Sequence, residues 1–162
     1  MMMKSLFSHI IVAVTGSDAS ISAAKYAILL SKFYRCHLTA VYVVDIATIR
    51  QLTLSKLFIQ EESQEYEKSL ELNGERYLSF VEELAHTKGV KIGREIRRGA
   101  VYTEILTIAE DKKADMIILG GLEKNRNPRD IISHAHREIM LNAKCSVLLV
   151  KDPSIDLIFK RA

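Results

Sequence analysis

Two kinds of hydrophobic pattern alternate along this chain. Short aliphatic and β-branched runs, typical of strands buried on both faces, occupy residues 9–15, 37–44, 116–119 and 146–150, and an alternating run at 90–98 is typical of an edge strand. Apolar residues at helical spacing predict helices at 19–34, 62–88, 101–113 and 129–142, with short helical pieces over a cleft within 46–60. This alternation predicts a mainly parallel α/β sheet with helices on both faces.

The carboxyl ends of three predicted strands form the expected ligand crevice, because open parallel sheets bind ligands where the strand order reverses. The three segments are Ala13 to Ser17, Val43 to Asp45 and Leu119 to Gly121. Glycine allows backbone N–H groups to approach a phosphate closely, so the pair Gly120-Gly121 favours a phosphate-binding loop. No glycine follows Gly121, however, and residues 122–128 fill this loop with side chains.

Polar residues near the predicted strands have local explanations. Ser17 or Asp18 is expected to cap the first helix, because their side-chain oxygens accept from first-turn N–H groups. Asp45 is expected to form a turn at the end of the second strand. Three basic residues of the edge run are expected to be solvated and to resist unwanted strand pairing: Arg94, Arg97 and Arg98.

Metal ligands and a reactive cysteine are not expected. His134 and His136 point about 200° apart on a helix, so they cannot chelate one metal ion together. Cys36 and Cys145 lie far apart in the sequence and are expected to be small core or boundary residues.

Length, composition and charge limit the classes of protein to which this chain can belong. The chain has 162 residues, enough for one domain, and we expect a single domain over 1–162 with a core at 9–151 and a tail at 152–162. Its 23 basic residues are interleaved with 20 acidic ones, and the net charge of +3 argues against nucleic-acid binding. The amino terminus is too short for a signal peptide and no apolar run spans a bilayer, so we expect a cytoplasmic protein without a membrane partner.

Four segments carry a resemblance to a known family. They are IIVAVTGSDAS at 10–20, VYVVD at 41–45, RRGAVYTEILTIAEDKKADMIILGG at 97–121 and NAKCSVLLVK at 142–151. In order and spacing they resemble the universal stress protein family. The resemblance implies a five-stranded parallel sheet sandwiched by helices, an adenine nucleotide alpha hydrolase-like (Rossmann-like) three-layer architecture. It also implies a homodimer that pairs its last strands, Ser146 to Val150.

One subclass of the family binds ATP through glycines that this chain keeps only in part. Counted from Gly120, the later signature positions fall on Glu123, Ser133 and His134, and the first-strand aspartate of ATP binders is Thr15 here. A carboxylate at residue 123 opposes phosphate binding, and Ser133 adds a Cβ where backbone should approach the ligand. The nearby cationic side chains favour phosphate binding instead: Lys124, Arg126 and Arg129. On balance we expect tight ATP binding to be absent.

These observations favour a non-enzymatic binding or regulatory protein of the stress response. No cofactor is expected, although ATP or another adenine nucleotide is possible, and an unidentified protein partner is expected. The candidate ligand contacts come from strand ends and from the start of the helix at 129–142: Val14, Thr15, Val43, Gly120, Gly121, Ser133 and His134. The alternatives are a nucleotide-binding protein with slow ATP hydrolysis and a subunit of an adenylate-transferring or electron-transfer enzyme. The apolar tail is expected to cover a partner subunit or the sheet edge.

Overall fold

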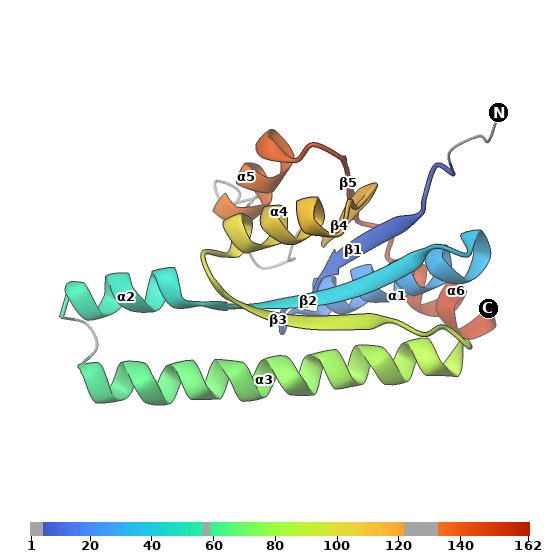
Figure 1. The fold of residues 1–162 in the computed structure, drawn as a ribbon. Coiled ribbons are helices and arrows are strands. Elements are labelled where there is room, and N and C mark those ends of the chain that lie inside the picture. The colour runs from blue at the N-terminus through green and yellow to red at the C-terminus, as the bar shows by residue number, and fades with distance from the viewer. Residues whose placement is uncertain (1–4, 57–58, 122–132) are drawn as a thin grey trace.

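A five-stranded parallel sheet forms the centre of the computed structural model, which describes residues 5–56, 59–121 and 133–162 (Figure 1). The strand order is β3-β2-β1-β4-β5, and each neighbouring pair is parallel. The elements in chain order are β1 (His9–Ala13), α1 (Asp18–Tyr34), β2 (His37–Asp45), α2 (Ile46–Leu54), α3 (Gln60–Thr87), β3 (Gly93–Gly99), α4 (Val101–Asp111), β4 (Met116–Gly120), α5 (His134–Asn142), β5 (Ser146–Val150) and α6 (Ile155–Arg161). The predicted parallel α/β class and the edge position of the third strand are confirmed.

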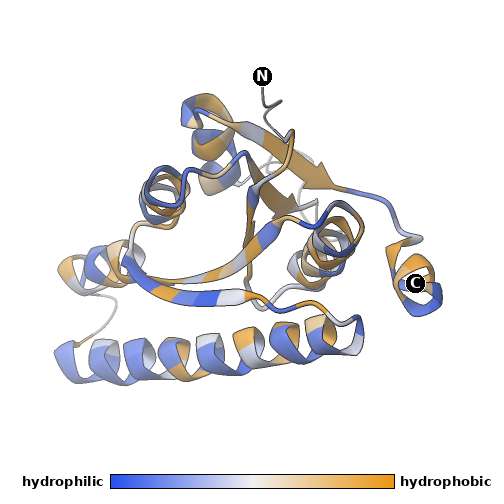
Figure 2. Ribbon diagram, turned by 45° about the vertical axis from the view of Figure 1, so that its right-hand side comes forward, coloured by the Kyte–Doolittle hydropathy of each residue, from blue (hydrophilic) through white to orange (hydrophobic). Residues whose placement is uncertain are grey.

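Helices cover both faces of the sheet, so its central strands β1 and β4 and most of β2 are apolar on both sides. On one face Val12 and Ala40 pack against α1 and α3, and on the other Ile11 and Val41 pack against α4 and α5. Figure 2 shows the same division, with the inner strands hydrophobic, the edge strand β3 largely hydrophilic and the long helix α3 hydrophilic over much of its surface. This three-layer arrangement leaves the carboxyl ends of β1, β2 and β4 at one edge of the sheet.

Side-chain oxygens begin the two helices that follow β1 and β2. The hydroxyl of Ser17 accepts from the N–H of Ser20 at the start of α1, as the sequence predicted. Asp45 accepts from the N–H of Thr48 at 3.1 Å and from its hydroxyl at 2.7 Å, so its expected turn is the N-cap of α2. These caps fix how the chain leaves each strand.

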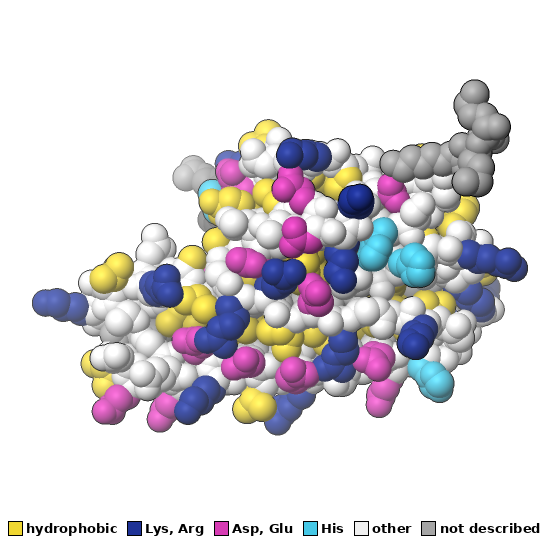
Figure 3. Space-filling view, in the orientation of Figure 1, with side chains coloured by type: hydrophobic (Ala, Val, Ile, Leu, Met, Phe, Trp, Pro, Cys, Tyr) yellow, Lys and Arg dark blue, Asp and Glu magenta, His cyan; other side chains and the backbone are white. Residues whose placement is uncertain are grey.

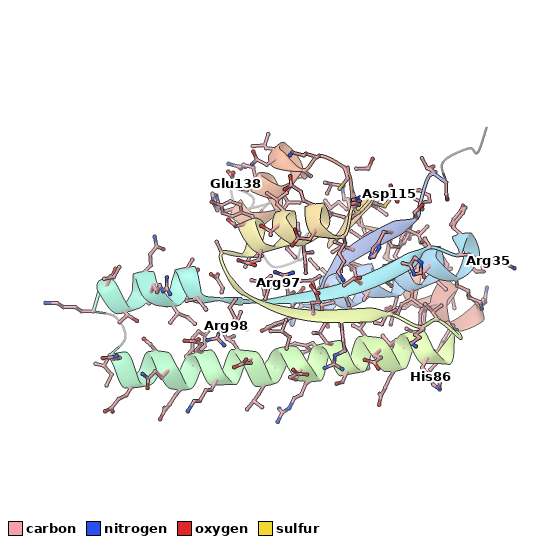
Figure 4. All side chains as sticks on the ribbon, in the orientation of Figure 1. Arg35, His86, Arg97, Arg98, Asp115 and Glu138 are labelled. Carbon is pink, nitrogen blue, oxygen red and sulfur yellow. The ribbon has the colours of Figure 1, made fainter. Side chains whose placement is uncertain are left out.

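The basic edge of the sheet differs from the prediction in two ways. The strand begins at Gly93 rather than Val90, because its pairing with β2 starts at Thr39. Its arginines are also ion-paired rather than merely solvated: Arg94 contacts Glu75 and Glu82 of α3, Arg98 contacts Glu67 and Glu71 of α3, and Arg97 contacts Glu95 and Asp111. In the view of Figure 4, Arg98 lies just above α3, and Figure 3 shows acidic and basic side chains interspersed over this face.

The tail forms α6, which packs on α1 of its own chain. Its predicted contact with a partner subunit stays a prediction. Ile155 and Phe159 are buried in the core on this side, and Asp156 forms a 2.7 Å ion pair with Lys25. Apolar residues four apart on one helix face explain why this face turns inward.

No helix among the described residues has the length and apolar character needed to cross a membrane.

Candidate functional site

A pocket of about 220 Å³ opens where β1 and β2 end. Its residues come from both strand ends, from α2, from the first half of α3 and from the start of α4. They are Ala13, Val14, Thr15, Gly16, Val41, Tyr42, Val43, Asp45, Thr48, Ile49, Leu52, Tyr66, Leu70, Val101 and Ile105. Most of this lining is apolar, which is typical of a small-molecule site with a few polar groups for orientation.

Two helices build the outer wall of the pocket. Asp45 caps α2 directly after β2, so Thr48, Ile49 and Leu52 follow along the helix face that lines the pocket. On α3, Tyr66 and Leu70 lie one turn apart and complete the wall. The pocket is therefore bounded by an aromatic ring and aliphatic side chains, with the Asp45 carboxylate and two threonine hydroxyls as its main polar side chains.

Hydroxyl groups within the turn from β1 into α1 form hydrogen bonds with the backbone of the same turn. Ser20 Oγ accepts from the N–H of Thr15 at 3.0 Å and donates to the Thr15 carbonyl at 2.8 Å. Thr15 Oγ1 accepts from the N–H of Ser17 at 3.2 Å. The N–H groups of Thr15, Ser17 and Ser20 thus all donate to side-chain oxygens within the turn.

The glycine pair after β4 is needed for packing within the protein. A Cβ on Gly120 would lie 2.7–2.8 Å from backbone atoms of Ala19 and Ser20, and a Cβ on Gly121 would overlap the carbonyl oxygen of Val150. Glycine permits both approaches because it has no side chain. The close contacts expected with a phosphate are therefore made with α1 and β5 at these two residues.

At the start of α5, a serine and a histidine connect the helix to β4. Ser133 is the N-cap and accepts from the N–H of His136 at 3.1 Å. His136 Nε2 lies 3.0 Å from the carbonyl oxygen of Gly120, which can only accept, so Nε2 carries the hydrogen. The ring's Nδ1 is hydrogen-bonded to the Ser133 hydroxyl. His134 is exposed and meets Tyr102 edge to face, with ring centroids 5.6 Å apart.

The structure brings together part of the predicted set of ligand contacts. Val14, Thr15 and Val43 line the pocket, whereas Gly120, Gly121, Ser133 and His134 lie outside its described lining, around the junction of β4 and α5. Glu123 and the cations predicted to oppose it, Lys124, Arg126 and Arg129, lie outside the described residues. The roles of all seven candidates in ligand binding stay predictions.

The short helical piece predicted over a cleft within 46–60 is present as α2, but the sequence did not indicate which of its residues line the pocket. Thr48, Ile49 and Leu52 were assigned no ligand role, although the spacing of a helix that starts at Asp45 places them on one face. Tyr66 and Leu70 were assigned to the apolar stripe of α3 without a cavity beside them. The spacing was available from the sequence, but the approach of α3 to α2 was not.

Other chemical sites are weaker candidates. In the described parts of the chain, no three His, Cys, Asp or Glu residues lie close enough to hold a metal ion. Burial raises the pKa of both the Cys36 and Cys145 thiols, which opposes formation of a nucleophilic thiolate. A larger hollow of about 300 Å³ lies beside Ala114 and Cys145, at the amino ends of β4 and β5. We take the smaller pocket as the candidate site because ligands bind at carboxyl ends in such sheets.

A family comparison decides what kind of protein carries this pocket. The model of the universal stress protein family matches residues 6–151. The chain belongs to the universal stress protein family. A curated universal stress protein of Methanocaldococcus jannaschii is 34% identical over 151 residues, which cover 93% of this chain and 85% of that protein. The resemblance inferred from the four segments is confirmed.

Solved structures of universal stress proteins share this fold. The structure of UspA from Lactobacillus plantarum superimposes with a TM-score of 0.76 at 22% identity, covering 90% of this chain and 98% of that one. A universal stress protein from Archaeoglobus fulgidus in complex with dAMP has a TM-score of 0.62 at 15% identity, covering 90% of this chain and 99% of that one. The expected adenine nucleotide alpha hydrolase-like architecture is thereby confirmed.

Proposed function

We propose that this universal stress protein is a non-enzymatic binding protein that holds an adenine-containing ligand in the pocket at the ends of β1 and β2. The observation that carries the proposal is the meeting of Val14, Thr15 and Val43 in one mainly apolar pocket. These residues come from the two adjacent strand ends at which ligands bind in open parallel sheets.

The chemistry of the pocket suits a flat heterocyclic base. Valine and leucine side chains offer apolar contact to both faces of a ring, and the Tyr66 ring adds an aromatic wall. Backbone groups at the strand ends, together with the Thr15 and Thr48 hydroxyls, supply donors and acceptors for the edge of a base. The dAMP complex of the Archaeoglobus fulgidus protein supports the choice of adenine as the base to test first.

The first experiment tests whether this pocket is the binding site. Leu52 lines the pocket on α2, so Leu52→Trp places an indole ring in its volume of about 220 Å³. We expect calorimetric titration with adenosine and its phosphates to show binding to the native chain and at least a tenfold loss in Leu52→Trp, about 1.4 kcal/mol or more.

The matched control is Leu54→Trp, on the same helix. Leu54 is 82% exposed and lies outside the pocket, so this variant should bind as the native chain does. Equal affinity of all three proteins would place the ligand elsewhere, and the absence of heat with every adenine ligand would refute the proposal. Release of ADP from ATP at a rate that follows ligand occupancy would favour the hydrolytic alternative.

We propose in addition that two copies of the chain associate through β5. This strand has β4 on one side and lies at the edge of the described sheet, with the backbone of Ser146 to Val150 on its other side. Edge strands readily pair with another chain through their free backbone groups. The side chains of Val147, Leu148 and Leu149 are half-buried in the monomer and supply apolar area for such a contact.

A further inference from the structure

A second pocket lies at the end of the sheet opposite to the candidate nucleotide site. It has a volume of about 300 Å³ and lies at the amino ends of β4 and β5. Its lining comes from the second half of α4, from the start of β4 and from the turn between α5 and β5. The helices α4 and α5 lie side by side on this face of the sheet (Figure 1). The volume is at the lower end of the range for small-molecule sites, roughly 300–1,000 Å³.

The buried part of this lining is apolar and belongs to the core. Ala109 and Ile117 are buried members of the core cluster on this face, and Leu106 and Cys145 pack against that cluster half-buried. Burial raises the pKa of the Cys145 thiol, so this side chain stays protonated and uncharged. Because protein interiors are normally close-packed, an open volume beside these side chains offers contact to an apolar group of a ligand.

The exposed part of the lining is charged. Glu110 lies in the last turn of α4, Lys113 follows that helix, and Lys144 follows α5. Lys144 Nζ forms a 2.8 Å ion pair with Glu110 Oε1, so the pair connects the two sides of the pocket. With two ammonium groups and one carboxylate, the described lining has a net charge of +1 and favours an anion.

The carbonyl groups at the end of α4 do not offset this positive charge fully, because they are hydrogen-bonded within the chain. The carbonyl oxygens of Ile108, Ala109 and Glu110 accept from the N–H groups of residues 112–114. These bonds satisfy acceptors that would otherwise attract a cation at the end of a helix. The lysine side chains therefore dominate the electrostatics of the pocket mouth.

We propose that this pocket binds a small amphipathic carboxylate, a molecule with a short aliphatic chain and one acidic group. The aliphatic chain lies against Leu106 and Ile117, and the carboxylate lies at the mouth, where Lys113 and Lys144 donate to it. The site is separate from the pocket at the ends of β1 and β2, and it does not depend on the proposed function.

The ion pair across the mouth permits such a ligand to enter. The side chains of Lys144 and Glu110 are 83% and 56% exposed, so their pair adds little stability and opens at low cost. The carboxylate of the ligand takes the place of the Glu110 carboxylate beside Lys144. Glu110 is consequently a competitor of the ligand, and Lys113 is a second cation for it.

Calorimetric titration of the full chain with three probes tests this chemistry. Octanoate has both the chain and the charge, 1-octanol lacks the charge, and acetate lacks the chain. We expect octanoate to bind with a dissociation constant below about 1 mM, 1-octanol to bind two- to fivefold more weakly, as roughly expected for one exposed ion pair, and acetate to give no heat. The absence of octanoate binding would overturn the site, and 1-octanol binding as tightly as octanoate would overturn the role of the carboxylate.

Two variants test the charged groups with opposite expected signs. Glu110→Gln removes the competing carboxylate and should raise the affinity for octanoate about two- to fivefold, whereas Lys113→Gln should lower it by about the same factor. Neither should change the affinity for 1-octanol. The control is Lys68→Gln, at an exposed position of α3 outside both pockets, which should bind octanoate as the native chain does. Lower octanoate affinity in Glu110→Gln, or unchanged affinity in both test variants, would contradict the proposal.

The reactivity of Cys145 locates the ligand without a substitution. Cys145 lines the pocket, and the other thiol of the chain, Cys36, is buried in the opposite core cluster and serves as an internal reference. At a concentration ten times its dissociation constant, octanoate should slow the reaction of Cys145 with N-ethylmaleimide about tenfold, because only the unoccupied pocket reacts. Peptide mass spectrometry measures both thiols separately. An unchanged rate at Cys145 beside bound octanoate would place the ligand elsewhere and overturn the proposal.

Discussion

Gly74 shows how a single residue can be explained only by its partner in space. Glycine inside a long helix costs about 1 kcal/mol relative to alanine. In α3, a Cβ on Gly74 would lie 2.5 Å from Cδ1 and 2.8 Å from Cε1 of Tyr42, whose buried ring packs under the helix. The glycine thus allows α3 to approach β2 closely, and Tyr42 in turn lines the pocket.

Replacing this glycine by alanine should therefore destabilise the protein. Helix propensity alone would make Gly74→Ala about 1 kcal/mol more stable, whereas overlap with Tyr42 should cost about 1–3 kcal/mol. We expect a net loss, measured by urea unfolding. A gain in the free energy of unfolding would contradict the close packing of α3 on β2.

His9 makes the stability depend on pH. It lies at the start of β1, with Nε2 3.1 Å from Thr39 Oγ1 and its ring centroid 5.8 Å from that of His37. Burial, assisted by His37 and Lys112, lowers the pKa of His9 below its usual 6.5, while Asp115 acts in the opposite direction. The unfolded chain consequently binds a proton more readily than the folded one.

Stability should therefore fall as the pH falls below about 6.5, where the unfolded state takes up its proton first. His9→Gln should flatten the pH dependence of the unfolding free energy below about pH 6.5. His86→Gln, at an exposed site near the end of α3 (Figure 4), is the control and should keep the slope of the native chain. An unchanged slope in His9→Gln would remove His9 as the cause.

The predictable part of the site consists of residues whose roles follow from strand ends. Val14, Thr15 and Val43 were identifiable because an apolar run stops at each strand end, and the geometry of parallel sheets brings these ends together. Leu52 and Tyr66 were not identifiable, because their positions depend on how α2 packs on α3. Gly120 lies close to the backbone of α1, a packing role that the sequence did not indicate, and its predicted ligand contact stays a prediction.

At the scale of elements, α6 lies beyond the residues that match the family model. The family match ends at residue 151, and α6 begins at Ile155. The helix buries Phe159 against α1, where Lys25 and Lys88 approach its ring at 5.8 and 4.7 Å from the centroid. The sequence showed that this tail is apolar, but several apolar surfaces were available to it and the pattern does not choose among them.

Phe159 should therefore stabilise the whole domain and not only the tail. We expect Phe159→Ala to lower the free energy of unfolding by about 3 kcal/mol, the usual cost of removing a buried aromatic ring. Leu157→Ala, on the same helix but 51% exposed, should cost less than about 0.5 kcal/mol. Chemical unfolding of both variants measures the difference, and equal stabilities would show that α6 contributes nothing to the core.

The covering of β3 by α3 was predictable in retrospect from charge spacing. Glu67, Glu71 and Glu75 recur every four residues, so they form one stripe along α3. Arg94 and Arg98 of β3 form ion pairs with this stripe. From the sequence of β3 alone, its arginines were expected to be solvated. Exposed ion pairs of this kind add little stability each, so their main effect is to fix the register of α3 on the sheet.

At the scale of the whole molecule, the alternation of strands and helices was sufficient to predict a parallel sheet with two helical layers. The order β3-β2-β1-β4-β5 was not predicted, because hydrophobic periodicity does not specify which buried strands are neighbours. This order places β5 at an edge, which makes the proposed dimer geometrically possible.

Light scattering tests the proposed association of two copies. We expect twice the mass of the 18.3 kDa chain at micromolar concentration. Val147→Lys places a charge on the edge strand and should yield the single-chain mass, since charged edge residues block strand pairing. A native chain that stays monomeric at high concentration would rule out pairing through β5.

The structure of the protein crystallised with saturating adenosine tests the central claim most directly. The account predicts density for the base between the strand ends at Val14 and Val43 and the helical wall at Leu52 and Tyr66, with the bonds among Thr15, Ser17 and Ser20 intact. Density for adenosine at another site, or an empty pocket beside a saturating ligand, would contradict it.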